Sequence, residues 1–319
     1  TAVALNRVSR VVGYSIQKGF FNTTSPNLPQ RIAIIGEANH ANQSSFVDGV
    51  PVQITSAAQA GAIFGYGSPI HLMARILFPA YGGGSVNAPV YVYPQAEASG
   101  AAAQIGTLTV GGATTSAASG TIYVNVAGRA NIDGASYAVQ VNAGDSHATV
   151  ATNIYQAINA VLSSPVTATN PSSGVVQTTT KWKGLTADEF NIYVTDNIGT
   201  GLTYTWAITT HGSGTPGVAS AFDSTVWNTI MVNGYGWASS VITSLNTFNG
   251  RPDPVNPTGM WTGTIMRPLV ALCGDITNEI STVETYPNEV TCANCPAINS
   301  TGFAFEAAAN YALLLANTE

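Results

Sequence analysis

Apolar and polar positions between Val50 and Phe78 predict one strand followed by two helices. Every second residue from 50 to 54 is apolar, which is the pattern of a strand with one buried face. Ser56 stands where its hydroxyl would cap a short helix at 57–63, and Ser68 with proline after it would begin a second helix. One apolar stripe runs along this second helix, made by Ile70, Met73, Ala74, Leu77 and Phe78. Such a unit needs a sheet to pack on.

The same patterns elsewhere predict an α/β core domain formed by residues 31–98 and 221–319. Short apolar runs bounded by glycine, proline or polar residues indicate strands. These runs are Arg31–Gly36, Pro89–Pro94, Trp227–Val232, Met266–Cys273 and Glu289–Pro296. Helices are predicted at Ser239–Phe248 and Gly302–Leu315. Alternation of strands and helices favours a sheet that is partly parallel.

Residues 99–220 predict a large inserted domain that is mostly β but carries one helix, an α+β arrangement. The segment is bounded by linkers rich in Ala, Gly and Ser. Strands are predicted at Leu108–Val110, Thr121–Ala127, Ser136–Val141, Val166–Ala168, Val175–Thr179, Asn191–Thr195 and Thr203–Ile208. A helix is predicted at Ala148–Leu162, with Asp145 or Ser146 as its cap.

Residues 1–30 predict an extended N-terminal arm without a core of its own. Apolar and basic residues alternate loosely here before a stretch rich in Asn and Pro. They are Val3, Leu5, Arg7, Val8, Arg10, Val11, Val12 and Tyr14. About 20 extended residues would reach roughly 65 Å, far enough to cross a subunit boundary. We expect the arm to add as a strand to the sheet edge of a neighbouring copy; the alternative is a small solvated basic tail.

Charge is sparse and unevenly placed along the chain. Only 8% of the residues are charged and 45% are hydrophobic, so self-repulsion is weak and order is expected. Residues 1–31 hold four basic residues and no acid, whereas the rest holds six basic and 16 acidic residues. A positive arm on a negative body favours head-to-tail association of identical copies. A stable extracellular β-rich protein would have the same composition.

Two classes of partner are not expected from the sequence. Ten basic residues, with no recurring basic face, are too few for a nucleic-acid surface. No apolar run is long enough for a transmembrane helix, so direct membrane insertion is not expected either.

No candidate site carries a recognisable reaction. Cys292 and Cys295 have a metal-like spacing, but a structural zinc needs four ligands and the histidines are scattered. Core or loop thiols, a bound metal and a redox pair are the alternatives for these cysteines. The glycines at 65–67 and 82–84 lack the lysine of a phosphate-binding loop and predict tight turns. Asp188–Glu189 predicts a loop or helix start rather than a catalytic dyad, so we predict no enzyme, no cofactor and no metal.

Four stretches of the chain resemble, in this order, the tail sheath proteins of contractile bacteriophages, in particular the Mu-like sheath family. Arg31–Gly36 (RIAIIG) resembles the first core strand of the family, and Val50–Phe78 resembles the strand–helix–helix unit after it. Lys183–Ile192 (KGLTADEFNI), with Asp145–Ala160, resembles the inserted domain, and Trp227–Gly236 (WNTIMVNGYG) resembles the strand that re-enters the core. No single motif is specific, and the order of the segments carries the resemblance.

The resemblance implies a structural subunit that polymerises helically around an inner tail tube and contracts to drive that tube through the host envelope. The implied partners are copies of itself, the inner tube protein, and the baseplate and tail terminator proteins. The implied location is the virion, after assembly in the host cytoplasm, with the inserted domain on the outer surface of the tube. The C-terminal domain of the family, which carries the inner-tube contacts, is expected to be absent from this sequence.

Two alternative functions stay open at this point. One is the sheath of a related injection machine, such as an R-type pyocin or a type VI secretion system. The other is a surface adhesin or fibre protein whose β-rich segment is a binding domain.

Overall fold

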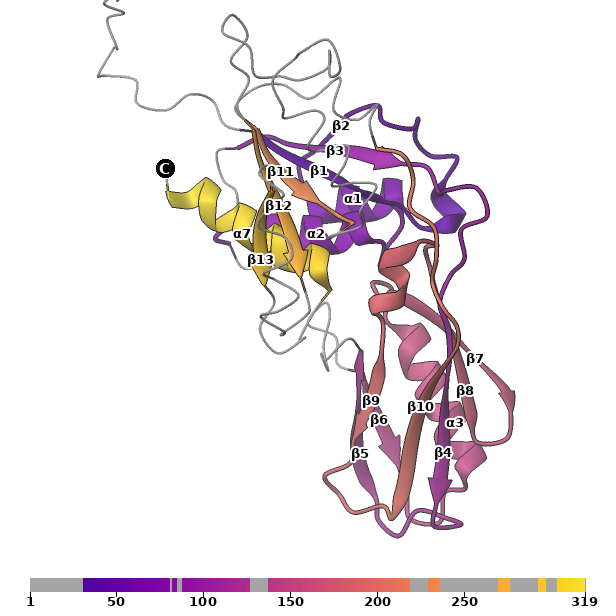
Figure 1. Cartoon of the computed structure of the whole chain (residues 1–319). Helices are drawn as coiled ribbons and strands as arrows, with labels where there is room; N and C mark the ends of the chain where they lie inside the picture. Colours follow the sequence, from indigo (N-terminus) through magenta and orange to yellow (C-terminus); the bar gives the residue numbers. More distant parts are fainter. Residues whose placement is uncertain are drawn as a thin grey trace, which may run out of the picture.

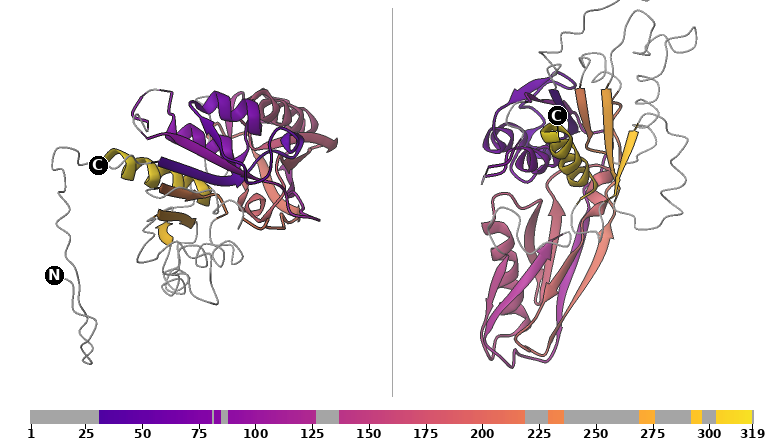
Figure 2. Two further views of the ribbon diagram at one scale, coloured as in Figure 1. Left: turned by 90° about the horizontal axis from the view of Figure 1, so that it is seen from above. Right: turned by 90° about the vertical axis from the view of Figure 1, so that its left-hand side faces the viewer.

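A computed structural model describes residues 31–80, 82–84, 88–126, 137–218, 229–235, 269–275, 292–296 and 303–318. Within these residues the chain is a mixed α+β structure with several sheets and the helices α1, α2, α3 and α7 (Figure 1). A six-stranded sheet and its helices form one end of the molecule, which we call the six-stranded part. Residues 105–210 form two smaller sheets at the other end, which we call the inserted part (Figure 2). The division of the chain into domains stays a prediction.

The six-stranded sheet is mostly parallel, in the order β13-β12-β11-β1-β3-β2. Its strands are β1 (Arg31–Glu37), β2 (Val52–Ile54), β3 (Val90–Gln95), β11 (Thr229–Asn233), β12 (Leu269–Asp275) and β13 (Cys292–Pro296). Only β2 runs antiparallel to its neighbour. The strands predicted at Arg31–Gly36 and Pro89–Pro94 are confirmed, as is a sheet that is partly parallel. The strands predicted at Trp227–Val232, Met266–Cys273 and Glu289–Pro296 are confirmed where the structure describes them.

Local capping positions the two helices that follow β2. Helices α1 (Ala57–Phe64) and α2 (Pro69–Leu77) begin after Ser56 and Ser68, whose hydroxyls accept the backbone N–H of the residue three positions on, each at 3.1 Å. Helix α2 packs on β1 and on α7 (Ala304–Thr318), and α7 lies along β11 and β12. These helices therefore cover one face of the sheet, as the apolar stripe of the second helix requires.

The predicted buried face over residues 50–54 is wrong in part. Strand β2 has only three residues, Val50 lies outside it and is 49% exposed, and Ile54 is its one buried apolar residue. The reason is topological, because β2 is the short antiparallel strand at the end of the sheet. The predicted helix at Ser239–Phe248 lies outside the described residues.

The inserted part has two antiparallel sheets, in the orders β10-β4-β8-β7 and β6-β5-β9. Its strands are β4 (Ile105–Gly112), β5 (Gly120–Val126), β6 (Ala138–Val141), β7 (Val166–Ser172), β8 (Val175–Thr180), β9 (Ile192–Thr195) and β10 (Leu202–Thr210). Helix α3 (His147–Ala160) packs on strands of both sheets and is capped by Ser146, one of the two predicted caps. It ends before the predicted Leu162, which is 65% exposed.

The turn between α1 and α2 touches the inserted part where only glycine fits. Gly67 has a φ of +85°, and a Cβ placed on it would lie 2.2 Å from the backbone carbonyl oxygen of Ser164. Ser164 belongs to the loop between α3 and β7. Backbone therefore lies against backbone at this point, so neither side can yield by moving a side chain.

Replacing Gly67 by alanine should lower the free energy of unfolding by more than about 2 kcal/mol, because left-handed strain and a backbone clash add. Gly82→Ala is the matched control, since Gly82 has a φ of +87° with no atom within 4 Å of its Cβ position. The control should lose only the backbone strain, about 1 kcal/mol. Urea unfolding of both variants measures the difference, and equal losses would contradict the contact.

Candidate functional site at the joint of the two parts

The residues predicted to link subunits lie outside the part of the chain that the structure describes. The candidate site described below is formed by other residues. Val3, Leu5, Arg7, Val8, Arg10, Val11, Val12 and Tyr14 lie outside the described residues. Cys292 and Cys295 lie on β13, where only the backbone is described. Cys273 is buried on β12, where its sulfur accepts the side-chain N–H of Asn233 at 3.2 Å.

Residues 181–190, which we call the joint segment, belong to the inserted part and contact the six-stranded part. The segment leaves β8 and passes through the short 3-10 helix η2 (Leu185–Glu189) to β9. Its backbone bonds to both parts: the N–H of His40, just after β1, donates to the carbonyl of Lys181 at 2.8 Å, and the N–H of Lys181 donates to Pro165 at 3.0 Å. The start of α7, the end of β1 and the turn between α1 and α2 also contact these ten residues.

Aromatic packing fixes the start of α7 against the joint segment. Trp182 is fully buried, with its ring edge-on to Phe303 at 5.9 Å and to Phe305 at 6.4 Å between centroids. The two phenylalanine rings are stacked at 5.0 Å. Glu189 accepts the backbone N–H of Ala304 at 2.8 Å, which satisfies one of the free donors at the start of the helix.

A buried carboxyl group lies at the centre of the joint. Glu37 ends β1 and is 1% exposed; its Oε2 accepts the hydroxyl of Thr186 at 3.1 Å. The Thr186 oxygen in turn accepts the indole N–H of Trp182 at 3.0 Å. The other carboxyl oxygen, Oε1, is buried without a partner. A Cβ on Gly184, whose φ is +150°, would lie 2.4 Å from that oxygen, so a glycine is required beside it.

Burial makes the Glu37 carboxyl group a weaker acid than an ordinary glutamate. Loss of hydration raises the pKa of Glu37 to about 8, the Thr186 hydrogen bond opposes the rise, and the charge of Glu97 adds to it. Burial also raises the pKa of Tyr235, with further contributions from the charges of Glu37 and Asp48. Glu37 is therefore mostly protonated at neutral pH, and none of the residues that the structure describes places a cation on it.

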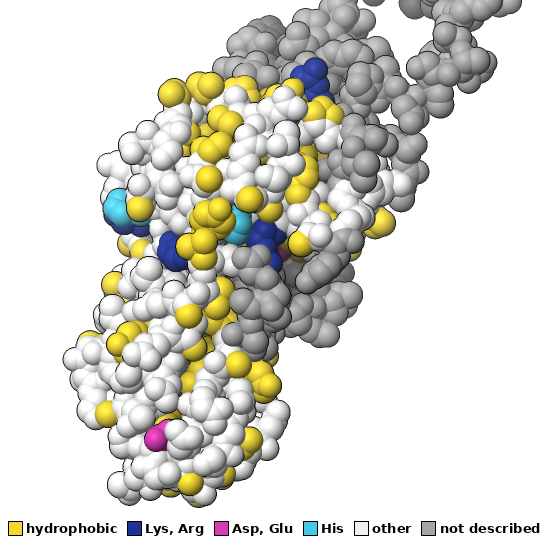
Figure 3. All heavy atoms as spheres, turned by 180° about the vertical axis from the view of Figure 1, so that it is seen from behind, with side chains coloured by type: hydrophobic (Ala, Val, Ile, Leu, Met, Phe, Trp, Pro, Cys, Tyr) yellow, Lys and Arg dark blue, Asp and Glu magenta, His cyan; other side chains and the backbone are white. Residues whose placement is uncertain are grey.

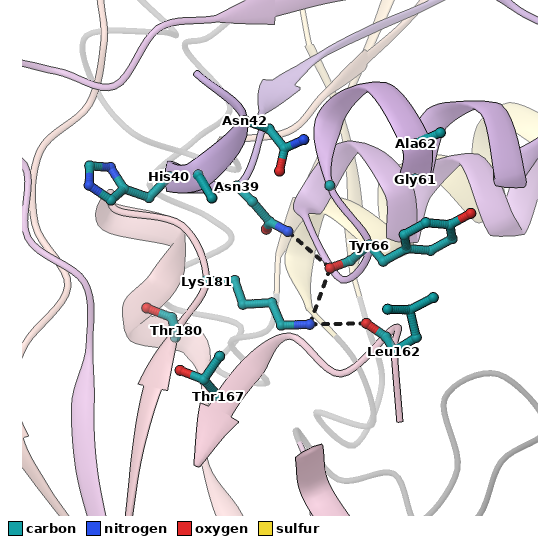
Figure 4. Close-up of a pocket in the computed structure, with 12 residues that line it drawn as sticks. Asn39, His40, Asn42, Gly61, Ala62, Tyr66, Leu162, Thr167, Thr180 and Lys181 are labelled. Atoms are coloured by element: carbon teal, nitrogen blue, oxygen red, sulfur yellow. Dashed lines mark hydrogen bonds between the residues drawn. The ribbon is translucent and has the colours of Figure 1, made fainter. Parts of the chain in front are cut away.

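A cavity of about 550 Å³ opens beside the joint segment, between α1, the loop after α3 and strands β7 and β8 (Figure 4). Lys181 reaches across it, and its Nζ donates to the carbonyls of Tyr66 at 3.3 Å and Leu162 at 3.0 Å. The side-chain N–H of Asn39 donates to the same Tyr66 oxygen at 2.9 Å. Burial lowers the pKa of Lys181 to about 8.

Two exposed histidine–carboxylate pairs flank the joint. His40 lies 2.8 Å from Glu97, and His211 lies 2.9 Å from Asp188, which also accepts the backbone N–H of Gly212. On the face in Figure 3, Lys, Arg and His side chains lie in the upper half of the molecule, while the lower end of the inserted part is almost uncharged. Charge in this view gathers toward the joint.

Two ionisable groups are available for chemistry at the joint. Burial raises the pKa of Glu37 and lowers the pKa of Lys181, so it favours the neutral form of each. The described residues hold no group of three or more His, Cys, Asp or Glu side chains arranged to bind a metal ion. No helix in the described ranges is long and apolar enough to cross a membrane. Asp188 and Glu189, the adjacent acids of the sequence, accept backbone N–H groups of different segments, so each is a structural acceptor.

Sequence reasoning marked the joint segment only through its resemblance to the inserted domain of a sheath protein. It missed Glu37, which follows the apolar run RIAIIG directly. An acid immediately after a buried strand is a usable signal, since such a residue lies where the strand leaves the sheet. It also missed Lys181, because nothing local distinguishes this lysine from Lys183.

Comparison with known proteins adds no family to these observations. No protein-family model matches the chain, and no curated protein matches it with significant similarity.

Replacing Glu37 by glutamine should remove a pH dependence of stability between about pH 5 and 8. The folded pKa of about 8 lies above the ordinary value of 4.5, so folded chains hold a proton that unfolded chains release in this range. Stability due to the protonated carboxyl is complete below pH 4.5 and is lost as pH rises to about 8. The unfolding free energy of the wild type should fall relative to Glu37→Gln by up to about 1.4 kcal/mol per pH unit.

Urea unfolding of both proteins from pH 5 to 9 measures this slope. Asp145→Asn, the same chemical change at the far end of the inserted part, is the control and should leave the slope in place. A difference between wild type and Glu37→Gln that stays constant across the range would show that Glu37 is ionised in the folded protein.

Proposed function

We propose that this chain is a structural subunit of a contractile phage tail sheath. In this proposal residues 31–98 and 221–319 form an α/β core domain, residues 99–220 form an inserted β-rich domain on the outer surface of the tube, and residues 1–30 form an extended arm. The subunit has no catalytic activity and no cofactor. It works in the virion, after assembly in the host cytoplasm.

One observation carries the proposal: stretches that resemble the family, although far apart in sequence, meet in space. Arg31–Gly36 falls on β1, which pairs with β11 from the stretch Trp227–Gly236. Val50–Phe78 supplies β2, α1 and α2, and the turn between these helices contacts Lys181, two residues before the stretch Lys183–Ile192. Within that stretch Thr186 donates to Glu37, the residue after Arg31–Gly36. Lys183–Ile192 contains most of the joint segment. A chance match of isolated stretches would not favour a single connected unit.

The proposed assembly rests on strand addition between copies. A sheet whose outer strands lack a neighbour offers unpaired N–H and C=O groups, and in the described sheet β2 and β13 are the outer strands. The alternating residues of the arm would bind such an edge of the next copy. Its positive charge would be attracted to the negative remainder of that copy.

Contraction in this proposal is a change between two packings of the same subunits. The energy is stored during assembly around the inner tail tube, with baseplate and tail terminator proteins at the ends, so no nucleotide is needed. Arms that stay bound would keep the copies linked while their folded parts rotate. The sheath of an R-type pyocin or a type VI secretion system would work in the same way.

The purified full-length gene product should form hollow, striated tubes in negative-stain electron microscopy, alone or with the inner tube protein added. Identical copies with complementary arms and edges polymerise without an energy source, which is the physical reason for this expectation. Dispersed particles under both conditions would contradict the sheath and favour the surface adhesin, which binding to glycans or host cells would then test.

Deleting residues 1–29 should leave a folded monomer that no longer polymerises, because the arm has no core of its own. Circular dichroism and sedimentation velocity measure the two properties separately. A matched variant replaces Val3, Leu5, Val8 and Val11 by serine, which keeps the length and charge of the arm but removes its apolar face. Tubes formed equally well by the deletion and the full chain would exclude a linking role for the arm.

A further inference from the structure

Lys181 carries an ammonium group whose third N–H donor has no acceptor among the residues that the structure describes. Its Nζ donates to the carbonyls of Tyr66 at 3.3 Å and Leu162 at 3.0 Å. Both acceptors are backbone oxygens, which stabilise the charged form of the amine. An ammonium group has three N–H donors, so one donor is left for another partner.

No carboxylate of the described residues pairs with this ammonium group. The described ion pairs join His40 to Glu97 and His211 to Asp188, and neither includes Lys181. Loss of hydration lowers the pKa of Lys181 to about 8, which still leaves about nine in ten side chains charged at pH 7. A partly buried cation without a counter-ion is costly, so an anion that pairs with it is stabilised.

The ammonium group is accessible from the cavity of about 550 Å³ beside the joint segment, because Lys181 is one of the residues that line it. A cavity of this volume is large enough for a small organic molecule. In the view of Figure 4 the Lys181 side chain lies between Tyr66 on one side and Thr167 and Thr180 on the other. A ligand held in the cavity can therefore reach Nζ.

The rest of the cavity wall is largely apolar. Ala62, on α1, lines it, and so does Leu162, whose side chain is 65% exposed. An exposed leucine on a cavity wall offers apolar surface that the body of a ligand can cover. The wall therefore combines a cation with apolar surface, which suits an amphipathic anion.

The charge of the wall selects an anion with a single charge. His40 and Tyr66 are the other titratable residues that line the cavity, and the ring of His40 lies 2.8 Å from Glu97. Among the described lining residues, Lys181 is therefore the one cation without an acidic partner. A phosphate group carries more than one charge at neutral pH and would leave part of it unpaired in a largely apolar cavity. A carboxylate carries one charge and matches the lysine.

We propose that this cavity is a binding site for small amphipathic monocarboxylates. The carboxylate accepts the third N–H of Lys181 in a charge-assisted hydrogen bond, and the apolar body covers Ala62 and the Leu162 side chain. These two residues belong to the six-stranded part and the inserted part, so a bound ligand stabilises the contact between the parts. The inference does not depend on the function proposed above, because it uses only the cavity and its contacts.

The test is isothermal titration calorimetry of the folded chain at pH 7 with naphthoate and, separately, with naphthamide, its uncharged analogue of nearly the same shape. Naphthoate should bind about tenfold more tightly, because a charge-assisted hydrogen bond to a partly exposed cation adds to the same apolar contact. Inorganic phosphate should not displace naphthoate, since it has no apolar body. Displacement by phosphate, or equal affinity for the two naphthyl probes, would overturn the proposal.

Variants of two residues connect the binding to the charge in the cavity. Lys181→Met should lower the affinity for naphthoate about tenfold and leave that for naphthamide unchanged, whereas Lys183→Met, two residues away, should change neither. Thr167→Asp keeps the lysine but places a competing carboxylate on the cavity wall, so it should also weaken naphthoate; Thr167→Asn, of the same shape, should not. Urea unfolding shows whether Lys181→Met is folded, and the Thr167 pair decides if it is not.

A further pair of variants tests the apolar half of the site. Leu162→Ser should weaken naphthoate and naphthamide alike, by about threefold, because both probes lose the same apolar contact. Leu314→Ser is the matched control, since Leu314 is 59% exposed on α7 and does not line the cavity. Absence of saturable naphthoate binding, or naphthoate binding that neither Lys181→Met nor Thr167→Asp weakens, would exclude this site.

Discussion

Burial of one carboxyl group between the two parts is the constraint on which the arrangement of this molecule depends. Glu37 ends the central β1 strand, and residues 181–190 close over it. Among the described residues no cation pairs with this carboxyl group, so its protonated form is favoured. The covering chain can come this close only without a side chain of its own, which is the second condition. Gly184 meets the second condition, since any Cβ would displace the carboxyl oxygen.

The joint segment ties together elements that are distant in sequence, so neither part can be treated as independent of the other. Trp182 completes the aromatic group at the start of α7, and Lys181 joins the turn before α2 to the loop after α3. Removing residues 104–211 would expose Phe303, Phe305 and the Glu37 carboxyl together. A six-stranded part without its insertion would therefore need changes at these positions to stay folded.

The features predicted correctly from the sequence depend on local interactions, and the features that were missed depend on non-local ones. The caps at Ser56, Ser68 and Ser146 follow from one hydroxyl and an amide three residues away, so they can be read from the chain. The burial of Glu37 arises from Thr186, which lies 149 residues away, and no local pattern carries it. The same holds for Val50, whose exposure follows from the place of β2 at the sheet edge.

Charged residues are sparse in this chain, and most of those described in the inserted part lie in the joint segment. Of the charged residues described between 105 and 210, four lie at 181–189, and the others are Asp145 and Asp196. Asp145 accepts the N–H of Asn142, and Asp196 accepts N–H groups of its own loop at 3.0–3.1 Å, so each stabilises only a local turn. A change in the charge of residues 181–189 therefore acts where the inserted part meets the six-stranded sheet. Most of the described charged residues of the inserted part therefore lie at the end that contacts the six-stranded part.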